Sequence, residues 1–138
     1  MVIADTGFFL ALANRRDQHH EVANKVAQTL RDPLVTTWPV MTETCHLLAA
    51  RVGHKSLTRF LTAAHHGAFQ VFALRIDHLP RITTLMDKYH DLPMDLADAS
   101  LVVLADELGS GKIVSTDTRD FRTYRWKNRH PFTNLLAV

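Results

Sequence analysis

The sequence alternates between short apolar runs and longer stretches with a helical pattern, and this alternation constrains the fold more than any other feature. The apolar runs have the length of β-strands and lie at residues 2–4, 34–37, 69–74 and 112–115. The helical stretches lie at residues 8–13, 19–30, 40–51, 56–66, 78–88 and 96–108. Strands that alternate with helices form right-handed crossovers, so we predict an α/β fold with a mostly parallel sheet covered on both faces.

Length and composition favour one soluble domain with its own core. The chain has 138 residues, so we expect a single domain over residues 1–138. Apolar residues make up 46% and charged residues 22%, which excludes disordered, collagen-like and coiled-coil proteins. Cys45 is the single cysteine and cannot form an internal disulfide, and no run reaches the ~20 apolar residues of a membrane span. The start of the chain lacks a signal-peptide pattern, so we expect a cytoplasmic protein with no membrane partner.

Three acidic residues follow predicted strands. Asp5 comes directly after the first strand, and Asp117 follows the strand that ends at residue 115. Glu43 lies in the first turn of the helix that opens just beyond the second strand. Parallel α/β sheets bind ligands outside the carboxyl ends of their strands. We therefore expect these three side chains at one functional edge of the sheet.

Two further acidic residues, Asp95 and Asp98, open the helix that leads into the last predicted strand. Their i, i+3 spacing places both carboxylates on one face of the first turn, at the same edge of the sheet. Asp95 also suits a helix N-cap without a catalytic role. Asp98 begins a helix with a mostly apolar sequence, so its charge needs a partner or an ion. An Asx turn at Asp117 and a helix-dipole contact at Glu43 remain alternative explanations for those two residues.

Carboxylates that converge in this way predict a cation. They repel each other and have raised pKa values unless a positive charge neutralises them. Hard divalent ions with oxygen ligands, Mg²⁺ or Mn²⁺, neutralise such a cluster. A site of this kind activates water and stabilises an in-line displacement at phosphorus.

The segments around these acids resemble a known family. They are VIADTG at residues 2–7, DQHHEVA at 17–23, TE at 42–43, YHDLPMDLADAS at 89–100 and IVSTDTRDF at 113–121. Their order and spacing are similar to those of the PIN-domain ribonucleases, in particular the VapC-type toxins of prokaryotic toxin–antitoxin pairs. The resemblance covers nearly the whole chain and implies a three-layer α/β/α fold.

The resemblance also implies an activity and a set of site residues. The family's four acidic positions fall on Asp5, Glu43, Asp98 and Asp117, and Asp95 matches a common accessory acid. It implies Mg²⁺- or Mn²⁺-dependent cleavage of RNA, homodimers and inhibition by a cognate antitoxin protein. In this hypothesis the metal is held by Asp5, Asp98 and Asp117, with Asp95 as a further candidate ligand. Glu43 orients or deprotonates the attacking water, and Thr6 and Thr116 donate hydrogen bonds that hold the carboxylates.

A basic segment near the end of the chain is the candidate RNA-binding surface. Its main cations are Arg119, Arg122, Arg125 and Lys127. Tyr124 and Trp126 lie between them and offer ring faces on which unpaired bases stack, and the cations suit a phosphodiester backbone. The alternative is a solvated basic surface with Trp126 packed into the core.

Other functions fit the sequence less well. Asp5, Thr6 and Gly7 form the aspartic-protease tripeptide, but here it enters a helix in a helix-rich chain. The nine histidines include no His-Glu-x-x-His motif, and no glycine-rich phosphate loop is present. The serious alternative is a catalytically silent PIN-like module that binds RNA or a protein partner.

Overall fold

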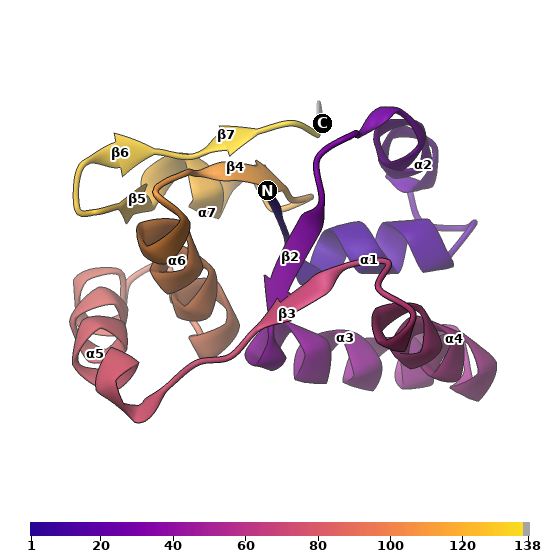
Figure 1. The fold of residues 1–138 in the computed structure, drawn as a ribbon, viewed down its shortest axis with the longest axis horizontal. Helices are drawn as coiled ribbons and strands as arrows, with labels where there is room; N and C mark the ends of the chain where they lie inside the picture. Colours follow the sequence, from indigo (N-terminus) through magenta and orange to yellow (C-terminus); the bar gives the residue numbers. More distant parts are fainter. Residues whose placement is uncertain (137–138) are drawn as a thin grey trace.

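A five-stranded parallel sheet forms the middle layer of the molecule (Figure 1). The computed structural model describes residues 1–136. The sheet has the order β3-β2-β1-β4-β7, and every neighbouring pair is parallel. Its strands are β1 (Val2–Ala4), β2 (Leu34–Thr37), β3 (Gln70–Phe72), β4 (Lys112–Val114) and β7 (Thr133–Asn134). The predicted α/β fold with a parallel sheet is confirmed.

Helices cover both faces of this sheet, which confirms the three-layer arrangement. One group is α1 (Thr6–Ala13), α2 (His20–Thr29), α3 (Trp38–Arg51) and α4 (His54–His65), and Figure 1 shows it on the right. The other group is the short 3₁₀ helix η1 (Ile76–His78), α5 (Leu79–Lys88), α6 (Leu96–Leu108) and α7 (Thr118–Thr123). Right-handed crossovers produce this division, because the chain moves from β1 outward to β3 and then back to β4 on the opposite face.

The core is centred on β1 and α6. All three residues of β1 are fully buried, as expected for the central strand of a sheet that is covered on both faces. The middle of α6, from 99 to 105, is buried all round because the helix packs against α5, α3, β1, β2 and β5. Gly109 ends this helix in the left-handed conformation, with a φ of 65°, which a glycine adopts without steric cost. The chain then enters β4.

The last quarter of the chain has more structure than the sequence pattern predicts. Beyond β4 lie α7, the antiparallel pair β5 (Arg125–Trp126) and β6 (His130–Pro131), and β7. Each of these three strands is two residues long, too short to show an alternating pattern. Elsewhere the predicted elements are present with shifted ends. For example, α1 begins at Thr6 rather than residue 8, because Asp5 caps it.

No helix within residues 1–136 is long and apolar enough to cross a membrane.

Candidate active site

Asp5 is a buried acidic residue at the carboxyl end of the central strand. It caps α1, and only 7% of the residue is exposed. Its Oδ1 accepts a hydrogen bond from the backbone N–H of Thr6 at 2.7 Å, and its Oδ2 accepts one from the hydroxyl of Ser115 at 2.9 Å. The pKa of Asp5 is raised to about 6: burial is the largest cause, the two hydrogen bonds oppose it, and the charges of Glu43 and Asp117 add to it. A bound cation would stabilise this carboxylate.

Ser115 orients the site and was not identified from the sequence. Its hydroxyl donates to Asp5 and accepts a hydrogen bond from the backbone N–H of Asp117 at 3.0 Å, so it links two of the acidic residues. The sequence instead predicts Thr6 and Thr116 as the donors. Thr6 holds Asp5 through its backbone N–H, while its buried hydroxyl has no hydrogen-bond partner within residues 1–136. The structure records no hydrogen bond from the Thr116 hydroxyl to a carboxylate of the described chain.

Gly7 allows the loop after β4 to approach the start of α1. A Cβ at this position would lie 1.9 Å from Oγ1 of Thr116, so any larger residue would push Thr116 away. Thr116 directly precedes Asp117. The glycine of the Asp-Thr-Gly tripeptide therefore serves the close packing that brings Asp117 near Asp5.

Asp95 and Asp98 form a reciprocal cap at the start of α6. Oδ1 of Asp95 accepts from the backbone N–H of Asp98 at 2.8 Å, and Oδ2 of Asp98 accepts from the backbone N–H of Asp95 at 3.3 Å. Burial raises the pKa of Asp98 to about 8, with the charges of Asp95 and Asp5 adding to the effect. Asp95 is exposed and caps its helix, as the sequence suggested, whereas Asp98 is half-buried and faces the other acids.

Tyr124 holds Asp98 from inside the protein. Its hydroxyl donates to Oδ2 of Asp98 at 3.2 Å, and its ring is fully buried against Tyr89 and Phe121. Burial and the nearby carboxylates raise the pKa of Tyr124, so this hydroxyl stays a donor. The interpretation of Tyr124 as an exposed platform for bases is therefore wrong. Trp126 is half-buried, with its ring 4.4 Å from that of His130 and its Nε1 donating to the carbonyl of Pro131 at 3.1 Å.

The other three predicted acids each lie within electrostatic reach of Asp5. Asp117 caps α7 by accepting from the backbone N–H of Asp120 at 3.2 Å, and burial raises its pKa. Glu43 is half-buried on α3, and its charge acts on Asp5. Asp5 in turn raises the pKa of Asp98. The carboxyl edge of the sheet thus collects negative charge, which Arg119 beside Asp117 offsets in part.

The donor set suits a hard divalent cation. The side chains that converge offer carboxylate oxygens, the ligands that Mg²⁺ and Mn²⁺ prefer, and their raised pKa values indicate that a cation would relieve repulsion. Within residues 1–136, however, no three acidic, histidine or cysteine side chains form a ready-made metal cage. Mg²⁺ does not require such a cage, because this ion commonly keeps several of its waters and binds through one or two carboxylates.

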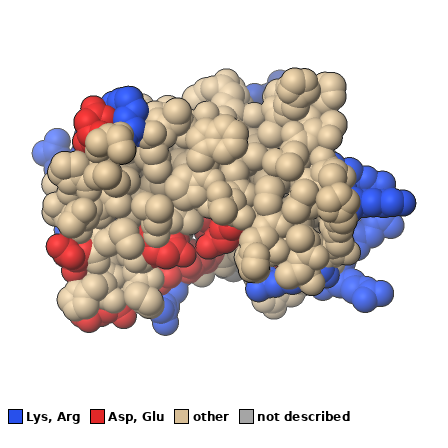
Figure 2. All heavy atoms as spheres, turned by 90° about the horizontal axis from the view of Figure 1, so that it is seen from below, with Lys and Arg blue, Asp and Glu red and all other residues tan. Residues whose placement is uncertain are grey.

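Two recesses flank the acidic residues. The first has a volume of about 680 Å³ and is lined by side chains that include Trp38, Glu43, His46, Asp95 and Leu96. The second, of about 570 Å³, is lined by side chains that include Asp17, Gln18, His19, Arg51 and Asp117. Figure 2 views the molecule from below Figure 1 and shows acidic side chains gathered beside a hollow near the middle of this face.

The predicted basic surface is only partly free to bind RNA. Arg119 and Arg122 are exposed on α7, and Lys127 is exposed in the turn between β5 and β6. Arg119 also lies 3.4 Å from the carboxylate of Asp120. Arg125 uses its guanidinium to donate to the carbonyls of residues 122, 123 and 124, so it closes the end of α7.

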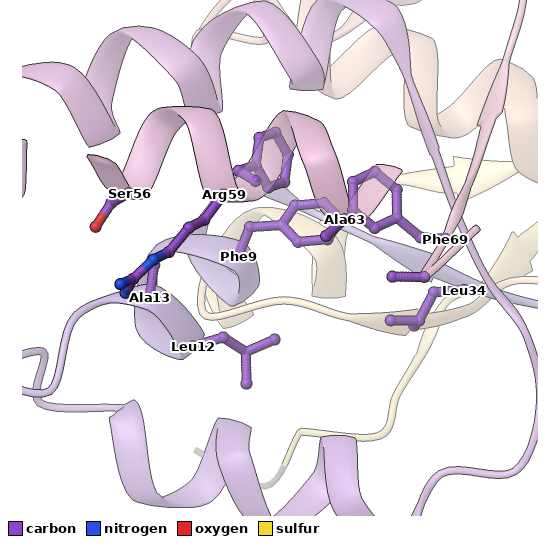
Figure 3. A pocket seen from close by; sticks show the side chains of 10 residues that line it. Phe9, Leu12, Ala13, Leu34, Ser56, Arg59, Ala63 and Phe69 are labelled. Atoms are coloured by element: carbon purple, nitrogen blue, oxygen red, sulfur yellow. The ribbon is translucent and has the colours of Figure 1, made fainter. Parts of the chain in front are cut away.

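A third pocket lies away from the acids. Phe9, Leu34, Phe60 and Phe69 line it, with Arg59 extending along it, and its volume is about 390 Å³ (Figure 3). The rings of Phe9, Phe60 and Phe69 pack on one another with centroids 4.8–5.2 Å apart. No acidic residue lines this pocket, so it does not belong to the acidic site.

Comparisons with known proteins agree with this geometry. The sequence profile of the PIN domain matches residues 2–127. Ribonuclease VapC26 of Mycobacterium tuberculosis is 28% identical over 124 residues, which cover 90% of this chain and 92% of that protein. The crystal structure of Mycobacterium tuberculosis VapC20, titled a sarcin–ricin loop cleaving toxin, has the same fold with a TM-score of 0.80 at 20% identity, over 86% of this chain and 92% of that chain. The chain therefore belongs to the PIN domain family, with distant homology to the VapC ribonuclease toxins.

Proposed function

We propose that this protein is an Mg²⁺- or Mn²⁺-dependent endoribonuclease and the toxin component of a type II toxin–antitoxin system. The observation that carries the proposal is the acidic edge of the sheet, where burial and mutual repulsion raise the pKa values of Asp5 and Asp98. Homology to VapC ribonucleases supports RNA as the substrate. We expect this activity to be cytoplasmic.

The proposed mechanism divides the acids between holding a metal and handling a proton. Asp5, Asp98 and Asp117 would hold the cation, with Asp95 at the rim. A bound Mg²⁺ or Mn²⁺ supplies positive charge that neutralises the scissile phosphate and makes water a better nucleophile. Glu43 would accept a proton from the attacking water, whose oxygen bonds to phosphorus as the bond to the ribose oxygen breaks, and the leaving ribose oxygen takes a proton from solvent water.

Hydroxyl groups of neighbouring side chains keep these carboxylates in place. Ser115 fixes Asp5 and the backbone of Asp117, and Tyr124 fixes one oxygen of Asp98.

Arg51 and His19 line the recess that Asp117 also lines, so they suit the phosphates next to the one that is cleaved. These groups orient the reactants without taking a proton from them.

Two protein partners complete the proposal. A toxin of this family is expected to form homodimers and to be inhibited by a cognate antitoxin encoded on another chain. The proposal of both partners rests on homology to the VapC toxins rather than on any contact within this chain.

The experiment that tests this function is cleavage of RNA by the purified, partner-free protein. We expect discrete RNA fragments in the presence of Mg²⁺ or Mn²⁺ and intact RNA when EDTA is added, because the acids alone have no positive charge to offer the phosphate. Mixed cellular RNA is the substrate, and gel electrophoresis is the readout. Stable binding of RNA without cleavage, unchanged by metal, would instead favour the silent RNA-binding module.

The exposed cations of α7 provide a second prediction. Replacing both Arg119 and Arg122 with Glu should weaken RNA binding about tenfold at low salt. It should also reduce the slope of log affinity against log salt concentration by about one to two, because RNA binding releases fewer counterions when phosphate contacts are lost. Arg125 is left unchanged because it closes the end of α7. Fluorescence anisotropy at several salt concentrations measures both quantities.

The matched control carries the same charge change on the opposite side of the sheet. Lys25 and Arg31 are exposed, and Lys25 lies on α2, away from α7. Replacing both with Glu should alter affinity by less than about twofold. An equal loss in the two double variants would mean that net charge, not the surface of α7, determines binding.

A further inference from the structure

Trp38 is a large aromatic side chain in contact with solvent beside the acidic site. It is 55% exposed at the start of α3 and lines the recess of about 680 Å³. Leu96, 47% exposed at the start of α6, lines the same recess, and so does the half-buried Leu74. The indole therefore has an open ring face within a mostly apolar hollow.

The charges around this recess indicate which part of a nucleotide fits it. Its acidic lining residues are Glu43 and Asp95, its other ionisable side chain is the imidazole of His46, and no Lys or Arg is among the described residues that line it. Phosphate groups would be repelled here, whereas a nucleobase is uncharged and has a flat face that stacks on indole. The recess on the other side of the acids is also lined by two carboxylates, Asp17 and Asp117, but it contains the guanidinium of Arg51, which suits phosphate.

The recess borders the acidic site, because Glu43 and Asp95 belong to its lining. Glu43 lines the recess and acts electrostatically on Asp5, and Asp95 caps the helix that carries Asp98. A group seated on Trp38 is therefore a near neighbour of the group that reacts. A second copy of the chain bound in this recess would also cover Glu43, which the proposed reaction needs. RNA is therefore the favoured occupant.

We propose that Trp38 stacks an unpaired base of the RNA next to the scissile phosphate, and so positions and selects the segment that is cleaved. The inference rests on the proposed ribonuclease function and adds to it a residue that selects the substrate. A base in a duplex is already stacked and paired, so it reaches Trp38 only at the cost of leaving its helix.

Fluorescence tests the contact directly, because the chain has two tryptophans. In a Trp126→Phe protein that also carries Asp98→Asn to prevent cleavage, the emission comes from Trp38 alone. A single-stranded oligoribonucleotide should quench this emission by about one third or more, and a blunt RNA duplex of the same length should leave it nearly unchanged. Anisotropy of the labelled oligonucleotide reports binding in the same samples.

The two kinds of failure are distinguishable. Bound oligonucleotide with unchanged Trp38 emission overturns the stacking contact and leaves the ribonuclease proposal in place. An oligonucleotide that does not bind, together with RNA that stays intact with metal, overturns both.

Cleavage kinetics in the otherwise natural sequence give a second, independent test. Trp38→Ala should lower kcat/KM for single-stranded RNA at least about fivefold, mainly through KM, while Trp38→Phe should stay within about twofold because it keeps a ring. Ile76→Ala is the control, since this residue is 83% exposed and does not line the recess. Unchanged kinetics in Trp38→Ala, or conversion of a dimer to a monomer by that variant in light scattering, would overturn the proposal.

Discussion

Asp5→Asn is expected to lower kcat/KM for RNA cleavage by roughly 10³-fold or more, the largest effect that we predict for a single substitution. Asp5 is buried at the centre of the acidic edge and is acted on by the charges of Glu43 and Asp117. Asn has the same shape and keeps an oxygen that accepts from the backbone N–H of Thr6. The substitution therefore removes the negative charge and leaves the hydrogen-bonded frame largely intact.

The matched control for this variant is Asp91→Asn. Asp91 carries the same side chain, but it is 91% exposed and lies 3.0 Å from the ring of the exposed His90. We expect cleavage by this variant within about twofold of the unmodified protein. Circular dichroism of both variants checks that they are folded. A folded Asp5→Asn protein with near-normal cleavage would show that the acidic edge is not the reaction site.

The general location of the site follows from the sequence by one rule of α/β architecture. Asp5 and Asp117 each come just after a short apolar strand, and parallel strands place their carboxyl ends at the same edge. Because β1 and β4 are direct neighbours in the sheet, these residues approach each other as expected. The sequence also predicts the helix start at Asp95 and Asp98, since the capping pattern involves only residues close together in the chain.

Ser115 was missed because its role depends on register between strands far apart in the sequence. Ala4 pairs with Val114 across the sheet, so the next residues on the two strands, Asp5 and Ser115, lie opposite each other. Sequence spacing within one strand contains no information about this pairing. Once β1 and β4 are known to be neighbours, the serine becomes an obvious partner for the buried carboxylate.

The packing of Tyr124 and Arg125 could not be predicted from the sequence, because composition does not distinguish an exposed side chain from a packed one. Both lie in a run of basic residues, which suggests a surface that binds nucleic acid. The six-residue helix α7 is too short to show a periodic pattern, so the inward direction of Tyr124 was not visible. Arg125 has three backbone carbonyls as partners only because that helix ends there.

Asp98→Asn is expected to stabilise the metal-free protein while it removes cleavage. The pKa of Asp98 is raised from 3.8 to about 8, mainly by burial and then by the charges of Asp95 and Asp5. Ionising this carboxyl is therefore costly in the folded chain, whereas Asn is neutral at every pH and keeps an oxygen that accepts from Tyr124. Since the carboxyl is only half-buried and partly screened by solvent, we expect a gain of about 1–2 kcal/mol in the free energy of unfolding at pH 8 in EDTA.

The pH dependence determines whether ionisation is the cause. Below about pH 4 the carboxyl is protonated in both states, and between about pH 4 and 8 the unfolded chain loses this proton first. The stability that the protonated carboxyl contributes is therefore lost as the pH rises through this range, and the gain of the Asn variant grows in parallel. Urea unfolding at pH 5 and pH 8 measures the gain, with Asp91→Asn as the control. Mg²⁺ at pH 8 should stabilise the unmodified protein more than the variant, because a bound cation offsets the charge that Asn lacks. A gain that is equal at both pH values would mean that packing, rather than repulsion among the acids, separates Asn from Asp at this position.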